Sequence, residues 1–270
     1  MSVRFTVLAL ALCAALPARA QDARDLYDLL RLDDLLAVMR LEGLAYGQEL
    51  GADMLGPNAG AGWTDLLEEI YDTERMESLV EARFTAAIDE DAVEPLIAYF
   101  DGADGREIVS LEIAAREALI DDAVEEAARE RYLELALDED DTRLDRIERF
   151  VEAGDLVEAN VAGALNSSLR FYSGLVDGGA IAMSEDEILR EVWSTEEETR
   201  ADTREWVYGF LLMAYRPLEA DALAEYVDLA ETDAGRALNA ALFEAFNAMY
   251  DDISYALGLA AARQMSVQEL

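Results

Sequence analysis

The sequence predicts an all-α protein of two tandem helical repeats, offset by about 130 residues, that pack as one multi-helix domain. Apolar residues recur every three or four positions along most of the chain, and no long stretch alternates apolar and polar residues as a strand would. Hydrophobic residues make up 53% of the chain, enough for a core. The pair Gly105-Arg106 also recurs as Gly235-Arg236.

The repeat needs no gap. The same offset of 130 residues pairs Asp91-Ala92 with Asp221-Ala222, and conservative apolar matches follow in the same register. Self-similarity at a fixed spacing is typical of duplicated helical units. We assign residues 21–137 to the first repeat and residues 138–270 to the second.

Each repeat is predicted to contain a helical hairpin around its Gly-Arg pair. The first helix ends near Phe100 or Ala230, and the second begins close to the pair. In the second copy Thr232 is the expected N-cap, because its hydroxyl can accept a hydrogen bond from a free backbone N–H. The aligned Gly102 caps less well, which favours a shift of the cap to Asp104.

Arg106 and Arg236 break a local rule at equivalent places, because a cation in the first turn opposes the helix dipole. Two interpretations follow. Glycine lets two helices approach while each arginine pairs with a carboxylate, or the arginines bind an anion or a partner. The structural interpretation is favoured.

The remaining elements follow from helical periodicity and from turn-forming residues. They comprise two N-terminal helices with a break near Asp33-Asp34, a loop at 51–62, a helix at 64–88, Pro95 in the first turn of the next helix, a helix at 121–137, an acidic hinge at 137–142, a central buried helix at 207–215 and a final helix at 232–265.

Residues 1–20 have the pattern of a secretory signal peptide: Arg4, an apolar run, and an Ala-Arg-Ala cleavage site that ends at Ala20. We expect a periplasmic or secreted protein that begins at Gln21, with no transmembrane segment. Removal of Arg4 and Arg19 would leave 19 arginines against 59 acidic residues, a net charge of −40.

All 21 basic residues are arginines, there is no histidine, and Cys13 lies within the predicted signal. A mature chain without Lys, His or Cys has no imidazole base, thiolate nucleophile or Schiff-base lysine. It also lacks the usual ligands of zinc and haem. We therefore predict no catalytic residue, no metal site and no cofactor.

The acidic balance also narrows the choice of partner. Nucleic acids and anionic lipid surfaces are bound through basic patches, so neither is expected. The expected partner is an envelope protein or a small ligand.

The segment 155–180 places Glu158, Asn160 and Asn166 among small and apolar residues. Buried carboxylates and amides need hydrogen-bond partners. The favoured interpretation is an internal network that fixes helix register, and the alternative is a cluster facing a ligand.

The stretches 30–47, 155–165 and 232–246 together resemble a family of secreted helical proteins from Gram-negative bacteria, known as domain of unknown function 2059. The resemblance extends over the predicted mature chain and implies a helical fold and an envelope location. It implies no activity. Gly102, in place of the usual hydroxyl cap, departs from the pattern.

These observations favour a non-enzymatic binding or interaction protein of the cell envelope. Two alternatives stay open. One is a carboxylate-dependent glycan hydrolase, with Glu42 and Glu158 as candidate acids, which would need two carboxylates roughly 5–10 Å apart in a pocket. The other is a carrier of an apolar ligand.

Overall fold

The computed structural model describes residues 15–56, 60–137 and 141–268, and within them 87% of the chain is helical with no strands. The all-α prediction is therefore confirmed. The helices run α1 Ala15–Leu29, α2 Leu32–Leu55, α3 Gly60–Ile70, α4 Thr73–Ala87, α5 Glu90–Phe100, α6 Ala103–Ala118, α7 Asp122–Leu135, α8 Thr142–Ala153, α9 Leu156–Asp177, α10 Glu185–Ser194, α11 Glu196–Ala214, α12 Ala220–Ala230 and α13 Asp233–Gln268.

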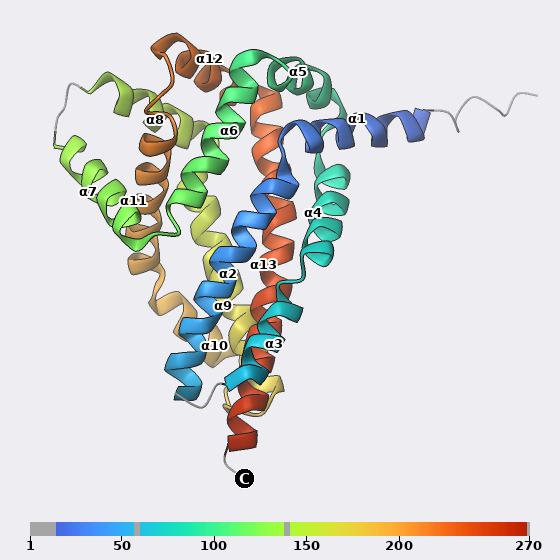
Figure 1. Ribbon diagram of the computed structural model, residues 1–270, viewed down its shortest axis with the longest axis vertical. Coiled ribbons are helices and arrows are strands. Elements are labelled where there is room, and N and C mark those ends of the chain that lie inside the picture. Colours follow the sequence, from blue (N-terminus) through green and yellow to red (C-terminus); the bar gives the residue numbers. More distant parts are fainter. Residues whose placement is uncertain (1–14, 57–59, 138–140, 269–270) are drawn as a thin grey trace, which may run out of the picture.

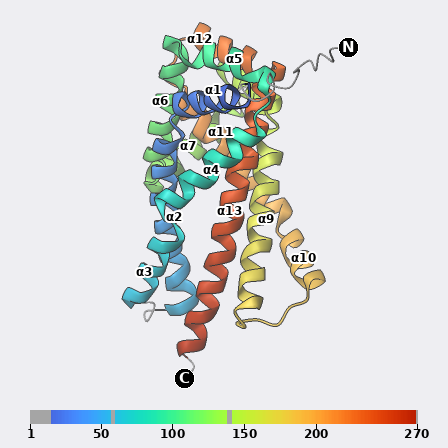
Figure 2. The ribbon, with the colours of Figure 1, turned by 90° about the vertical axis from the view of Figure 1, so that its right-hand side faces the viewer.

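Helix α13 forms the centre of the bundle, with its most extensive contact along α9 and further contacts to α4, α5, α2 and α3 (Figure 1). Figure 2 shows α9 and α13 side by side over most of their lengths. The predicted apolar stripe on the final helix faces the core, and its buried members include Leu238, Met249, Ile253 and Leu257. The spacing of apolar residues at every third or fourth position therefore predicted this helix and its buried face correctly.

Glycines allow α9 and α13 to approach closely. A Cβ atom on Gly258 would overlap the carbonyl oxygen of Phe171, and one on Gly174 would overlap the backbone of Tyr255. Both positions therefore require a residue without a side chain, as expected from the small residues of segment 155–180.

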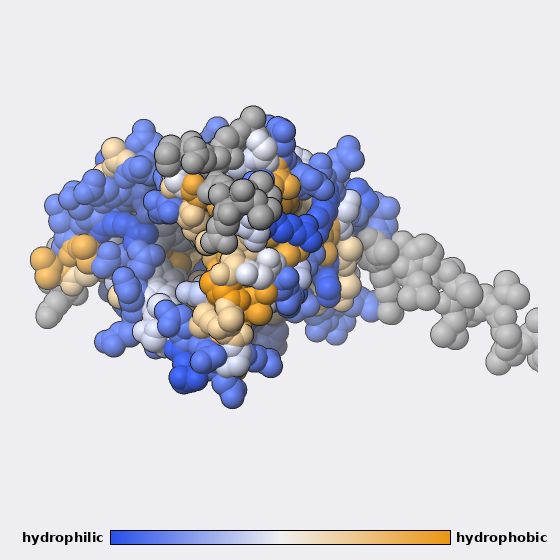
Figure 3. Space-filling view, turned by 90° about the horizontal axis from the view of Figure 1, so that it is seen from below, coloured by the Kyte–Doolittle hydropathy of each residue, from blue (hydrophilic) through white to orange (hydrophobic). Residues whose placement is uncertain are grey.

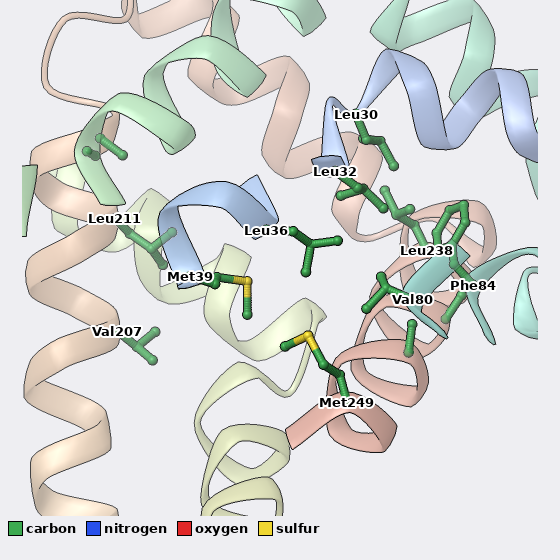
Figure 4. Close-up of a cluster of buried hydrophobic side chains, with 14 of the residues drawn as sticks. Leu30, Leu32, Leu36, Met39, Val80, Phe84, Val207, Leu211, Leu238 and Met249 are labelled. Carbon is green, nitrogen blue, oxygen red and sulfur yellow. The ribbon is translucent and has the colours of Figure 1, made fainter. Parts of the chain in front are cut away.

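One continuous hydrophobic core joins helices from both predicted halves. In Figure 4, Leu36 on α2, Phe84 on α4, Val207 on α11 and Met249 on α13 point toward a common interior, together with Leu30 in the turn that follows α1. The segment 207–215 is largely buried, as predicted, although α13 rather than α11 is central.

Two boundaries in the first half were predicted wrongly. The segment 64–88 forms two helices, because the Asp72 side chain accepts a hydrogen bond from the Arg75 backbone N–H at 2.9 Å and starts α4. The loop predicted at 51–62 is shorter, since α2 continues to Leu55 and α3 begins at Gly60. Residues 57–59, 138–140 of the acidic hinge and 1–14 of the predicted signal lie outside the described residues.

Pro95 was predicted in the first turn of its helix. It lies instead at the sixth position of α5. The helix begins earlier because the Asp89 side chain accepts the Asp91 N–H at 3.0 Å. Proline removes one backbone donor within a helix, and this 11-residue helix accommodates that loss near its middle.

The corners around the two Gly-Arg pairs have the same local structure. Helices α5 and α12 have equivalent bounds at the 130-residue offset, and α6 and α13 begin at equivalent positions. A Cβ on Gly105 would overlap the carbonyl oxygen of Tyr99, and a Cβ on Gly235 would overlap the equivalent oxygen of Leu229. The glycines thus allow close helix approach at both corners.

Beyond the corners the two segments differ. Helix α6 ends at Ala118, where Asp121 caps α7 through the Ala123 N–H, whereas α13 continues to Gln268. Duplication of the complete halves remains a prediction. Thr232 caps α13 through the Gly235 N–H at 3.0 Å, as expected, but the cap of α6 is Gly102 itself and does not shift to Asp104.

No helix in the described part of the chain is long and apolar enough to cross a membrane. Seen from the end that carries α3 and the C-terminus, hydrophilic residues cover most of the surface around a small hydrophobic area (Figure 3).

Candidate binding site between α2, α6, α9, α11 and α13

A cavity of about 350 Å³ lies where five helices meet, and it is open to the surface. Its apolar wall consists of Met39 on α2, Trp206 on α11 and Phe243 and Phe246 on α13. Such a volume is at the lower end of the roughly 300–1,000 Å³ range of small-molecule sites.

Arg116 is the charged group of the cavity. It binds Glu42 through two parallel hydrogen bonds, Nε to Oε1 at 2.9 Å and Nη2 to Oε2 at 2.8 Å. The side chains of Arg116 and Glu42 are only 22% and 26% exposed. The fork geometry fixes the guanidinium plane, and the carboxylate offsets its charge.

Two aromatic side chains complete the surroundings of Arg116. Its guanidinium lies 5.5 Å from the centre of the Trp206 ring, and Tyr250 lines the same cavity. Burial by itself lowers the pKa of Arg116, but Tyr250 and Glu42 together raise it above the ordinary value. Arg116 is therefore a permanently charged, rigidly held group.

Polar side chains with free hydrogen-bonding capacity also line the cavity. Asn160 donates to the Leu156 carbonyl oxygen at 2.7 Å, which leaves its amide oxygen without a partner in the described part of the chain. The side chains of Ser167 and Asn247 have no hydrogen bond to any described residue. Gly163 makes room for Asn247, whose amide oxygen would overlap a Cβ atom there. The cavity thus offers donors and acceptors that the protein itself does not use.

Two of the six predicted site residues belong to this site. Asn160 lines the cavity, and Glu42 holds Arg116. Glu158 and Asn166 are exposed, and Glu158 pairs with Arg200 on α11. The predicted buried network of Glu158, Asn160 and Asn166 is therefore wrong: successive positions on α9 face different directions, and only Asn160 turns inward.

Arg106 and Arg236 lie at the equivalent corners, away from the cavity lining. Arg106 pairs with Asp101 at 2.7 Å and Arg236 with Asp233 at 2.6 Å, and both arginine side chains are more than half exposed. The predicted carboxylate near each arginine is present at both corners.

Sequence reasoning missed Arg116, Trp206, Asn247 and Tyr250. One signal was available: Asn247 interrupts the otherwise apolar surroundings of Phe246 and Met249 on the final helix. No sequence signal marked Arg116, because its local sequence is like that of the other arginines that follow acidic residues on a helix.

A second polar group, partly buried, lies near the α12 end of the bundle. Oε1 of Glu112 accepts hydrogen bonds from the hydroxyls of Tyr215 at 2.5 Å and Tyr226 at 3.2 Å. Burial raises the pKa of Glu112, although both hydrogen bonds act to lower it. We assign this group a structural role, because it links α6 to the segments on either side of the α11–α12 turn.

The lining of the cavity contains no carboxylate side chain, so the paired acids of a glycosidase are not found there. Among the described residues, no group of three or more His, Cys, Asp or Glu could hold a metal ion.

Comparisons with protein-family models, with curated proteins and with solved structures found no match to this chain.

Proposed function

We propose that the protein is a non-enzymatic binding protein of the cell envelope that holds a small neutral polar ligand in the cavity beside Arg116. The observation that carries the proposal is the combination of amide and hydroxyl groups that keep unused hydrogen-bonding capacity with an aromatic wall, in a cavity whose single arginine is already neutralised by Glu42. Sites of this kind use a few polar groups to orient a ligand that apolar surfaces enclose.

The charges in and around the cavity favour a neutral ligand over an anion or a cation. An anion would have to compete with Glu42 for Arg116 and would meet the repulsion of a chain of net charge −38. A cation would find no carboxylate in the lining to pair with. A neutral molecule with polar edges and an apolar face fits Asn160, Asn247 and Trp206 together, and a sugar residue has both features.

An acetamido group adds to the fit. Its N–H and C=O match the acceptor and donor capacity of the Asn160 and Asn247 side chains. We therefore propose an N-acetylated sugar, of the kind found in envelope glycans, as the ligand. The envelope location is part of the proposal and is supported by the signal-like residues 1–20 and by the resemblance to secreted helical proteins.

The binding test is native mass spectrometry of the purified protein with N-acetylglucosamine and with glucose. The variant Ala164→Trp blocks the cavity, because Ala164 is an exposed residue in its lining. The matched control is Ala162→Trp, an exposed alanine on the same helix outside the lining.

We expect one N-acetylglucosamine per chain, weaker binding of glucose, loss of binding in Ala164→Trp and retention in Ala162→Trp. Binding of neither sugar to the wild type, or equal binding by Ala164→Trp, contradicts the proposal. For location, N-terminal sequencing after expression in a Gram-negative host is expected to start at Gln21, and an intact Met1 in the cytoplasmic fraction would contradict export.

A further inference from the structure

A second and larger cavity of about 820 Å³ lies between α7, α11 and the start of α8, away from Arg116. Figure 1 shows α7 beside α11, with α8 above them in the view. Its walls are largely apolar, with Val124, Ala127 and Leu135 from α7 and Leu212 and Met213 from α11. The lining follows α7 from Ala123 to Leu135, which is about 18 Å at 1.5 Å per residue.

Three arginines also line this cavity, in a chain with almost three times as many acids as arginines. Arg143 donates hydrogen bonds to the carbonyl oxygens of Tyr215 at 2.5 Å and Leu218 at 3.1 Å, which holds it beside Arg216. Within the described part of the chain, neither Arg143 nor Arg216 forms an ion pair. Arg131 pairs with Glu134 at 3.1 Å, on the outer surface.

The two aspartates in the lining form no ion pair with these arginines. Asp121 and Asp141 are helix N-caps whose Oδ1 atoms accept backbone N–H groups at the starts of α7 and α8. Arg131 is offset by Glu134, which leaves Arg143 and Arg216 as the arginines of the lining without an ion pair among the described residues, in a chain of net charge −38. A local positive charge beside an apolar wall is complementary to an anion that carries a hydrocarbon chain.

We propose that this cavity binds one long-chain carboxylate, with its hydrocarbon chain along α7 and α11 and its carboxylate against Arg143 and Arg216. The volume lies within the roughly 300–1,000 Å³ range of cavities that enclose one small organic molecule, so it suits a single acyl chain. Guanidinium groups bind carboxylates through charge-assisted hydrogen bonds. This site is separate from the sugar site and does not depend on it.

The test is isothermal titration calorimetry of the delipidated full chain with sodium laurate below its micelle concentration. The variant Arg216→Gln removes an exposed, unpaired guanidinium, and Ala127→Trp fills the cavity from an exposed position. Matched controls are Arg263→Gln, an exposed arginine with no ion pair among the described residues, and Ala162→Trp on α9. Circular dichroism of each variant checks that it retains the wild-type helix content.

We expect one laurate per wild-type chain, about tenfold weaker binding in Arg216→Gln, and no measurable binding in Ala127→Trp. Both controls should bind as the wild type does. Dodecanol, which has the same chain without the charge, should bind at least tenfold more weakly. Absence of laurate binding, equal affinity for dodecanol, or unchanged binding in a folded Ala127→Trp would overturn the proposal, whatever the result with sugars.

Discussion

Substitution of Glu112 by Gln should stabilise the protein at neutral pH and remove part of its pH dependence. The amide oxygen of Gln can still accept from Tyr215 and Tyr226, but the cost of burying a charge disappears. Burial raises the folded-state pKa of Glu112 above the ordinary value of 4.5, so the folded protein holds this proton more tightly than the unfolded chain does.

The sign of the effect follows from linkage. The stabilisation from protonated Glu112 is complete below the unfolded pKa and is lost as pH rises through the folded pKa. Each tenfold difference in proton affinity corresponds to about 1.4 kcal/mol of unfolding free energy. Wild-type stability should therefore fall relative to Glu112→Gln as pH increases from about 4.5 toward neutrality.

Glu112→Ala should have the opposite effect, because it leaves both tyrosine hydroxyls without an acceptor. An unsatisfied buried polar group costs about 1–3 kcal/mol, so the variant should lose about 2–6 kcal/mol at all pH values between 4.5 and 8.

The assay is urea unfolding followed by circular dichroism at half-unit pH intervals. Glu117→Gln, an exposed position on the same helix, is the control for general charge effects. If the difference between wild type and Glu112→Gln is the same at every pH, Glu112 does not titrate differently in the folded state and the reasoning fails.

Three further predictions concern stability. Arg116→Met should cost about 3–5 kcal/mol in chemical unfolding because it leaves Glu42 partly buried and unpaired, and the double variant with Glu42→Gln should recover part of this loss; additive losses would contradict coupling. Gly105→Ala and Gly235→Ala should lower the melting temperature by similar amounts, whereas Gly62→Ala, which meets no close neighbour, should not lower it; a change at only one corner would argue against their equivalence. Raising sodium chloride from about 0.01 M to 0.15 M at neutral pH should raise the melting temperature, because screening reduces repulsion among 59 acids more than it weakens exposed ion pairs; a flat or falling value in both sodium and potassium chloride would show that local pairing dominates.

Local rules predicted most helices and several of their buried faces. The break before α2, the Thr232 cap and the apolar stripe of α13 depend on residues close in sequence, so periodicity and capping chemistry were sufficient. The break at Asp72 was missed because the apolar pattern continues across it. The position of Pro95 was missed because the Asp89 cap starts the helix earlier than proline preference suggested.

The sites depend on contacts distant in sequence, and this explains why they were largely missed. Arg116 meets Glu42 74 residues away, and Tyr226 reaches Glu112 across 114 residues. Asn160 was selected for its small and apolar surroundings, but Glu158 and Asn166 had the same surroundings and face solvent. Polarity within a helical pattern therefore indicated candidates, but only the packing of α2, α6, α9, α11 and α13 showed which of them share a cavity.

The most direct test of the sugar-binding proposal is two-dimensional NMR of the tryptophan indole N–H groups during titration with N-acetylglucosamine. Trp206 lines the cavity, whereas the buried Trp63 donates its indole N–H to the Gly47 carbonyl oxygen at 2.9 Å, outside the cavity lining. The Trp206→Phe variant assigns the resonance. We predict a saturable shift of the Trp206 indole signal with the Trp63 signal unchanged. A Trp206 signal that does not move at saturating sugar, or a shift confined to another tryptophan, would contradict the proposal.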